Sequence, residues 1–296
     1  MQDISLELYR IFYIVAESKN ISKAAERLFV SQSAVSQAIM QLEQKLGGRL
    51  FDRGARGVTL TPEGEVLYAY VENAISMIEN AQEKLQKMRK LSEGEIKIGA
   101  SDTICSLFLL PRLKKFNEEY PGVYISVTNR VTSESIGLLK NGAVDISFVN
   151  LPIDGDPQLE IIPVMPVHDC FVAGKKYAFL ADGVHDYSVL QSYPVLMLEQ
   201  ASNTRLLLDR LLSENNVQIN PAIELGSLSL LAEFAVIGLG VAATIREDVK
   251  NMLDSGELYE LRFKKELPAR HIGLVKMKNM ALSPAAKKFM DNIYIS

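Results

Sequence analysis

The sequence has few of the residues that build metal centres and disulfide frameworks. Only two of its 296 residues are cysteine and three are histidine. Cys105 and Cys170 stand far apart in the chain, which fits a reducing compartment and predicts no disulfide framework. His168, His185 and His271 lack the spacing of metal ligands, so we expect no metal site. Nothing near either thiol marks it as activated, which makes a redox switch a minor alternative.

Long uncharged apolar runs are missing as well. Asp3 and Glu7 interrupt any signal-peptide pattern, and the longest apolar stretch, residues 228–245, contains Glu233 and two glycines. This stretch is better divided into a helix, a turn and a strand than interpreted as a membrane span. We therefore expect a soluble, cytoplasmic protein without a membrane segment.

Motifs of the common catalytic sites are also absent. The chain has no glycine-rich phosphate loop, no nucleophile elbow and no convergent arrangement of serine, histidine and aspartate. We therefore expect neither an enzyme nor a bound cofactor.

The most informative stretch lies near the N-terminus, at residues 22–46 (SKAAERLFVSQSAVSQAIMQLEQKL). Its apolar residues recur at steps of three and four, which places them on one buried stripe of two short helices. Ser31 follows the break at Phe29 and Val30, and it can cap a second helix that begins at about Gln32. This pattern predicts a helix-turn-helix, although an ordinary helical hairpin with a polar face is the alternative.

The second of these helices carries amide and hydroxyl side chains on its outer face. Such groups hydrogen-bond both phosphates and base edges in a major groove. The predicted DNA-binding residues on this helix are Gln32, Ser33, Ser36, Gln37 and Gln41.

A short hairpin is predicted from residue 50 to residue 60, with a glycine-rich tip. Arg53 and Arg56 stand where this wing can reach the phosphate backbone or a minor groove. Between Lys19 and Leu60, seven basic residues outnumber three acidic ones, so the segment carries +4 while the whole chain carries −4. Because local charge governs the encounter with DNA, this segregation supports a DNA-binding domain.

A long helix is predicted from Pro62, a residue favoured in the first turn, with Thr61 as its cap. Apolar residues along it alternate steps of four and three, which is the heptad pattern of coiled coils. Charge at most other positions favours a dimer contact over a core helix, and a dimer suits two half-sites related by dyad symmetry. The predicted seam consists of Leu67, Val71, Ala74, Ile78, Ala81, Leu85 and Met88.

Residues 1 to about 91 resemble the N-terminal domain of the LysR-type transcriptional regulators. The resemblance includes the run Ser31-Gln32-Ser33-Ala34-Val35-Ser36, the pair Leu50-Phe51 and the pair Thr61-Pro62. It implies that the working assembly is a homodimer or homotetramer that bends promoter DNA and alters access of RNA polymerase. The DNA-contacting positions that it implies are Gln32, Ser33, Ser36, Gln37 and Arg53.

After a break at residues 92–94, strand-like and helical runs alternate in two sets, which predicts α/β organisation with parallel sheets. The resemblance implies two Rossmann-like lobes in a periplasmic-binding-protein-like (type 2) effector domain. The predicted domains are a winged helix-turn-helix at 1–61, a linker helix for dimerisation at 62–91, and an effector-binding domain at 92–296. Within the last, lobe one covers about 92–165 and 268–296, and lobe two covers about 166–267.

Hydroxyl and amide residues recur where the predicted strands end and helices begin. Ligands bind at this edge of a parallel sheet because helix N-termini present free amides there. Such neutral donors suit a small carboxylate, with Arg130 and Arg205 as candidate counter-ions, whereas Asp102 favours an amine-bearing ligand. Plain helix capping is the alternative for any one of them. The candidate effector-binding residues are Ser101, Asp102, Thr103, Thr128, Ser202, Asn203, Thr204, Ser227 and Thr244.

Together these patterns predict a transcriptional regulator whose DNA binding responds to a small-molecule effector in the interlobe cleft. Two alternatives stay open: a redox-responsive regulator of the same fold, and a solute-binding module without DNA function. Salt-dependent binding to duplex DNA separates a regulator from a solute-binding module or an enzyme.

Overall fold

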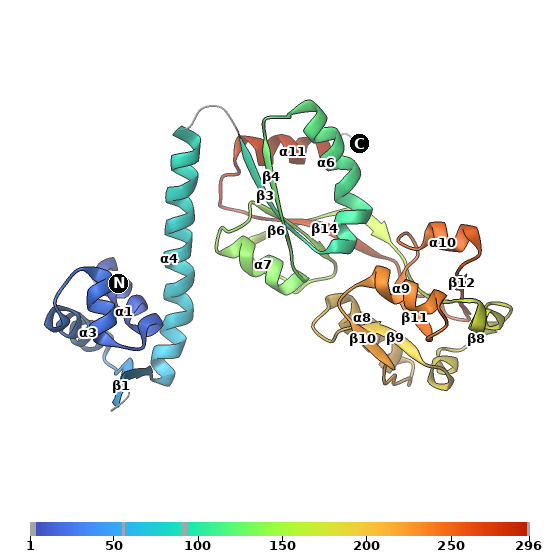
Figure 1. Ribbon diagram of the computed structural model, residues 1–296, viewed down its shortest axis with the longest axis horizontal. Coiled ribbons are helices and arrows are strands. Elements are labelled where there is room, and N and C mark those ends of the chain that lie inside the picture. Colours follow the sequence, from blue (N-terminus) through green and yellow to red (C-terminus); the bar gives the residue numbers. More distant parts are fainter. Residues whose placement is uncertain (1–3, 55–56, 90–93, 295–296) are drawn as a thin grey trace. The chain divides into compact units, whose positions relative to one another are not determined.

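The computed structural model describes residues 4–54, 57–89 and 94–294, without the side chains of 53, 54, 83–89 and 294. The chain forms two compact units, Met1–Gln86 and Lys87–Ser296, and the division falls inside a long helix (Figure 1).

In the N-terminal unit, the described residues form three short helices, a two-stranded hairpin and a long helix. Each short helix begins after a residue whose side chain accepts a hydrogen bond from a first-turn amide, at Ser5, Asn20 and Ser31. The elements are α1 (Leu6–Ser18), α2 (Ile21–Leu28), α3 (Gln32–Leu46), β1 (Phe51–Gly54), β2 (Gly57–Leu60) and α4 (Pro62–Arg89).

One hydrophobic core holds these helices together. Val35 and Leu42 of α3 are fully buried, and they pack in a cluster with Phe12 of α1 and Ala24 of α2. The ring of Phe12 also lies 5.3 Å from the ring of Phe51 in the hairpin. The predicted apolar stripe of the second helix is therefore confirmed, and it leaves the opposite face of α3 exposed.

The described part of the C-terminal unit contains two five-stranded sheets, one in each lobe. In both sheets, parallel strands lie beside antiparallel ones. The first sheet has the order β4 (Tyr124–Asn129), β3 (Glu95–Ala100), β5 (Ile146–Asn150), β14 (Arg270–Met277) and β6 (Leu159–Val167). The second has the order β10 (Ile223–Leu225), β9 (Val195–Leu198), β11 (Val241–Ile245), β7 (Asp169–Ala173) and β12 (Tyr259–Glu260).

Helices connect the parallel strands of each lobe. The helical segment after β3 includes one π-helical turn, η1, where the sequence predicts an ordinary helix. The first lobe contains α5 (Asp102–Ile104), η1 (Cys105–Leu109), α6 (Leu110–Glu119), α7 (Thr132–Lys140) and α11 (Pro284–Tyr294). The second contains α8 (Asn203–Glu214), α9 (Leu228–Val236), α10 (Lys250–Ser255), the short helices η2 (Lys175–Ala181) and η3 (Tyr187–Ser192), and a small pair of strands, β8 (Val184–His185) and β13 (Arg262–Phe263).

The predicted α/β lobes with parallel strands are present, but their sheets are mixed because the strands that join the lobes pair antiparallel with their neighbours. The chain crosses from β6 to β7 at His168 and returns ahead of β14, and β14 is antiparallel to both β5 and β6. These strands enter each sheet from the other lobe rather than through a helical crossover, so their direction is not restricted to parallel.

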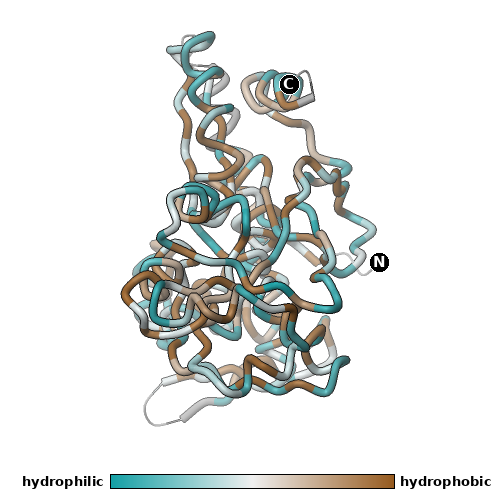
Figure 2. Tube along the Cα trace, turned by 90° about the vertical axis from the view of Figure 1, so that its right-hand side faces the viewer, coloured by the Kyte–Doolittle hydropathy of each residue, from teal (hydrophilic) through white to brown (hydrophobic). Residues whose placement is uncertain are grey.

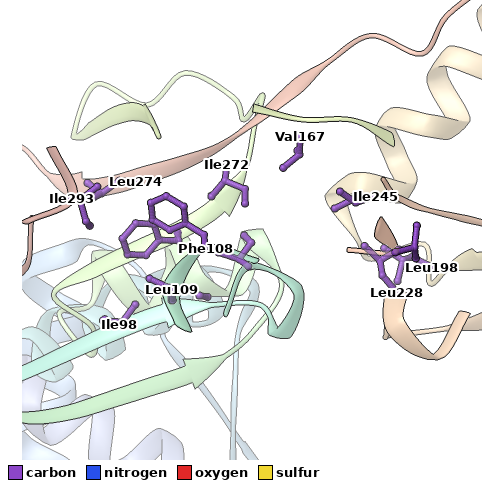
Figure 3. Packing of buried hydrophobic residues seen from close by; sticks show 14 of the residues in the cluster. Ile98, Phe108, Leu109, Val167, Leu198, Leu228, Ile245, Ile272, Leu274 and Ile293 are labelled. Carbon is purple, nitrogen blue, oxygen red and sulfur yellow. The ribbon is translucent and has the colours of Figure 1, made fainter. Parts of the chain in front are cut away.

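A buried hydrophobic cluster extends from the first sheet to the second (Figure 3). It includes Ile98 and Phe108 in the first lobe, and Leu198, Leu228 and Ile245 in the second. This shared core brings the carboxyl ends of β3 and β9 toward the same space between the lobes.

Hydrophobic and hydrophilic residues are interspersed along the chain (Figure 2). Within the described residues, no helix is long and apolar enough to span a membrane.

Candidate DNA interface and effector cleft

Helix α3 presents the predicted DNA-reading residues on its exposed face. Gln32, Ser33, Gln37 and Gln41 are exposed, and Ser36 is half-buried. The Ser31 side chain accepts a hydrogen bond from the amide of Ala34, which fixes the start of the helix. The structure thus gathers all five polar side chains on one accessible surface.

Hydrogen bonds donated by backbone amides of the wing fix it to the N-terminal helices. The Val58 amide donates to the Lys19 carbonyl at 3.2 Å. The Glu43 carboxylate of α3 accepts from the Leu50 amide at 2.8 Å. These bonds set the hairpin beside α3. The backbone of Arg53 belongs to β1, whereas its side chain and the whole of Arg56 lie outside the described residues.

Helix α4 begins at a small hydrogen-bond network around Thr61. The Thr61 hydroxyl donates to the Arg49 carbonyl at 2.8 Å and accepts from the Gly64 amide at 3.0 Å. The predicted cap of the linker helix is therefore confirmed, and the same side chain connects that helix to the segment that precedes the wing.

The predicted seam on α4 divides into two parts. Leu67 and Val71 pack against the core of their own unit, and Val71 is only 6% exposed. They stabilise the N-terminal unit itself, which differs from their predicted role in a dimer. Ala74, Ile78 and Ala81 are exposed, while the side chains of Leu85 and Met88 lie outside the described residues.

Exposed apolar residues that the heptad analysis missed lie beside this seam. Val66, Tyr70 and Met77 are 64%, 75% and 38% exposed. They occupy positions one residue before Leu67, Val71 and Ile78, so the exposed apolar stripe is rotated by one residue around the helix. We call the exposed stripe the α4 stripe: Val66, Tyr70, Ala74, Met77, Ile78 and Ala81.

A cavity between the lobes, which we call the cleft, collects six of the nine predicted effector-binding residues. Its walls come from the β3–α5 junction and from the N-terminus of α8. The six residues are Ser101, Asp102, Thr103, Ser202, Asn203 and Thr204. Thr128 and Ser227 are not among its lining residues; Ser227 instead caps α9 by accepting from the Leu230 amide.

Several polar groups in and beside the cleft have no hydrogen-bond partner within the described part of the chain. They include the buried hydroxyl oxygens of Ser101 and Thr244. Thr244 is only 2% exposed and lines a small inner cavity together with Thr204. Ser202, at the N-cap of α8, accepts no capping hydrogen bond among these residues. Unpartnered hydroxyls and an uncapped helix N-terminus favour an anion, whereas the two acidic residues that also line the cleft, Asp102 and Glu199, repel one.

Neither candidate counter-ion faces the cleft as a free charge. Arg205 is 4% exposed, and its guanidinium binds both oxygens of Asp209, the carbonyl of Leu198 and the carboxylate of Glu224. Arg130 forms an exposed ion pair with Glu134 at 3.5 Å. Both arginines are engaged within their own lobe, so neither is a free counter-ion for a ligand in the cleft.

Two family models match the chain, and together they cover most of it. The bacterial regulatory helix-turn-helix protein model of the lysR family matches residues 6–65, and the LysR substrate binding domain model matches residues 89–294. The chain belongs to the LysR family of transcriptional regulators. The second match makes the C-terminal unit the effector-binding domain of this LysR-family regulator.

Similar proteins support the assignment over nearly the full length. The HTH-type transcriptional regulator YfeR of Shigella flexneri is 29% identical across 97% of this chain and 92% of its own. Full-length CbnR, solved with its target DNA, has a TM-score of 0.64 at 16% identity, covering 99% of both chains. The effector binding domain of QuiR, solved with shikimate, has a TM-score of 0.60 at 21% identity, covering 68% of this chain and 96% of that one.

A bridge across the lobes of this LysR-family regulator was not predicted from its sequence. The Asn203 side-chain amide on α8 donates to the carbonyls of Asn150 and Pro152, at 2.8 and 3.1 Å. The side-chain oxygen of Asn150 accepts from Arg270 at 2.6 Å, and Arg270 forms a two-pronged ion pair with Asp169. We call these four residues, Asn150, Asp169, Asn203 and Arg270, the lobe bridge.

Burial changes the pKa of three further titratable groups in the effector domain. The pKa of Asp248 is raised, first by burial and then by the nearby charge of Asp102. Burial also raises the pKa of the thiols of Cys105 and Cys170. A raised thiol pKa disfavours the thiolate, which is the reactive form of a cysteine. Among the described residues, no cluster of three or more potential metal ligands occurs.

Proposed function

We propose that this LysR-family regulator binds promoter DNA through α3 and the wing. The observation that carries the proposal is the polar face of α3, where four amide or hydroxyl side chains are exposed and that of Ser36 is half-buried. On the opposite face, Val35 and Leu42 pack in the core. Short neutral donors of this kind discriminate base edges in the major groove. The DNA complex of full-length CbnR, a protein of the same fold, supports this use of the N-terminal unit.

Duplex binding with salt titration tests this proposal. Genomic fragments enriched by the full-length protein supply the target, and fluorescence anisotropy measures binding. We expect Gln37→Ala to reduce discrimination between target and random duplex by about 1–3 kcal/mol, the range of one base-edge contact. Gln158→Ala, an exposed glutamine of the effector domain, is the control. If Gln37→Ala left discrimination intact while binding remained salt-dependent, α3 would not be the reading helix.

We propose in addition that a small carboxylate binds in the cleft and changes the equilibrium between lobe arrangements. The support is the uncapped N-terminus of α8 together with the unpartnered hydroxyls of Ser101 and Thr244 among the described residues. The effector domain of QuiR, which is similar in fold, binds shikimate. A ligand that prefers one arrangement shifts the population toward it.

A thermal-shift screen of the full-length protein tests the effector proposal. Small carboxylates, amino acids and amines are compared, because ligand binding to the folded state raises its apparent stability. We expect carboxylates to raise Tm and Ser101→Ala or Thr204→Ala to abolish the shift. Ser213→Ala, an exposed serine at the other end of α8, should retain it. Stabilisation by amines alone would overturn the carboxylate assignment and point to Asp102.

The α4 stripe supports the further proposal that the protein assembles as a homodimer or homotetramer. Exposed apolar side chains at heptad spacing on one helix are the sequence signature of a helix pair. Dimerisation gives the two α3 helices the dyad symmetry of paired half-sites.

A further inference from the structure

A groove of about 640 Å³ lies beside the cleft, lined by α7, by α8 and by the loop at residues 152–156. The groove and the cleft share three lining residues, Thr132, Ala201 and Asn203. The two spaces are therefore neighbours that meet at the N-termini of α7 and α8. Like α8, α7 begins without a side-chain cap among the described residues.

The groove combines an apolar surface with one available cation. Ile136, Ile153 and Leu206 line it, and Leu206 is 55% exposed. Arg210 also lines the groove, is exposed and has no ion-pair partner among the described residues. A guanidinium in this position offers planar, two-pronged binding to a carboxylate or phosphate.

The other charges in the groove are a neutralised pair and one acid. Lys140 and Asp156 form an ion pair at 2.5 Å, which lowers the pKa of the Asp156 carboxyl through the hydrogen bond to Lys140. Asp154, in the same loop, is exposed and lacks an ion-pair partner among the described residues. An anion is therefore attracted to the α8 wall and repelled by the loop wall.

The spacing along α8 relates the two spaces to each other. Arg210 follows Asn203 by seven residues, which corresponds to about 10 Å along a helix axis. One anionic group at the α8 N-terminus and a second at Arg210 are therefore separated by the length of a flexible chain of several methylene groups. Leu206 lies between the two positions on the same helix.

We propose that the groove is the outer half of the effector site and that it binds the second anionic group of an elongated dianion. The inner carboxylate occupies the cleft, the apolar body lies on Leu206 and Ile136, and the outer anion pairs with Arg210. Asn203, which lines both spaces, contacts the ligand between its ends. This inference rests on the proposed carboxylate site in the cleft.

A series of straight-chain dicarboxylates, from succinate to azelate, tests the proposal. Each dicarboxylate is compared with the monocarboxylate of the same chain length. Isothermal titration calorimetry of the full-length protein measures the ratio of the two affinities. We expect the longer dicarboxylates to bind about fivefold more tightly than their monocarboxylate partners, the size of an exposed ion pair of about 1 kcal/mol. Arg210→Ala should remove this advantage, and Asp154→Asn should increase it.

A control variant distinguishes binding of the outer anion in the groove from binding of the inner carboxylate in the cleft. Arg262→Ala removes an exposed arginine of the same lobe that does not line the groove, and it should keep the advantage. If dicarboxylates and monocarboxylates bind equally in the parent protein, or if Arg210→Ala keeps the ratio, the groove proposal is overturned while the cleft stands. If neither series binds, both proposals fail.

Discussion

At the residue scale, two helices of the N-terminal unit are followed by a residue in the left-handed backbone conformation. One of these residues is a phenylalanine and the other is a glycine. Phe29 is the C-cap of α2 and has φ 57°, and Gly47 is the C-cap of α3 and has φ 76°. A left-handed conformation strains any residue with a Cβ and costs glycine almost nothing. The Phe29 side chain is 95% exposed, so it gains little from packing in return.

Replacing these two residues should therefore have opposite effects on stability. We expect Phe29→Gly to raise the free energy of unfolding by about 0.5 kcal/mol and Gly47→Ala to lower it by about 1 kcal/mol. A Cβ at Gly47 meets no atom within 4 Å, so its effect reports backbone strain alone. Urea denaturation of the full-length protein measures both. A loss of stability in Phe29→Gly would show that the ring makes a stabilising contact.

Tyr13 gives the N-terminal unit a pH dependence in the alkaline range. Burial, followed by the hydrogen bond to Glu17, raises the pKa of Tyr13 from 10.0 to about 12. The folded state thus holds this proton more tightly than the unfolded state. The stabilisation is fully present below pH 10 and is lost as the pH rises to about 12. The pKa values of Tyr68 and Tyr187 are raised as well, so ultraviolet titration of tyrosinate should show several late-titrating groups, one of which Tyr13→Phe removes.

At the element scale, α4 has two neighbouring apolar stripes. One packs against the core of the N-terminal unit, and the other, the α4 stripe, is exposed and can contact a partner helix. Met77, in the exposed stripe, is the sharper target because Val71 is needed for the core. We expect Met77→Glu to shift the protein toward monomer by placing charge in an apolar seam, as measured by sedimentation velocity. Glu65→Gln, at the exposed first turn, is the control. An unchanged oligomer would place the interface elsewhere.

The strands β7 and β14 are joined at their starts by a buried ion pair. Arg270 and Asp169 have side chains only 5% and 13% exposed. Asp169→Ala leaves the guanidinium buried without its partner, which should cost about 3–5 kcal/mol in chemical denaturation. The double variant Asp169→Leu with Arg270→Met should cost much less, because no charge is then stranded. Additive losses would show that the two side chains do not act as a pair.

Local elements of this fold are predictable from sequence, because their causes are local. Ser31 caps α3 and Thr61 begins α4, as expected from their positions before amphipathic runs. The heptad pattern places Val71 in the dimer seam, although this residue packs inside its own unit, and leaves out Met77, which is exposed. Both lie within a continuous apolar region of α4, and only the packing of the N-terminal core selects which side faces inward.

At the scale of the whole molecule, the sequence could not reveal contacts between distant segments. Asn203 appeared among the candidate effector residues because it follows a strand, yet its amide binds carbonyls more than fifty residues away. Arg205 was a candidate counter-ion, but Asp209 on the next turn and Glu224 bind it within its own lobe. Ser227 was expected in the site and caps α9 instead.

The lobe bridge should restrain the two lobes, so a substitution that removes its hydrogen bonds should change the lobe arrangement. Asn203→Ala removes two hydrogen bonds between α8 and the end of β5. We expect the lobes to populate more open arrangements, seen as a larger radius of gyration in small-angle X-ray scattering of the ligand-free protein. Asn215→Ala, which removes two side-chain hydrogen bonds within one lobe, to Leu211 and from Lys265, should leave the radius unchanged. An unchanged radius in Asn203→Ala would mean that the bridge does not restrain the lobes.

Asn150 takes part in the lobe bridge with two different parts of its structure. Its main-chain carbonyl accepts from Asn203, while its side-chain oxygen accepts from Arg270. Only the second contact depends on the amino acid encoded at position 150, because every residue supplies a carbonyl. In evolutionary terms, we therefore expect substitutions at position 150 to depend on the residue at position 270 and not on the residue at position 203.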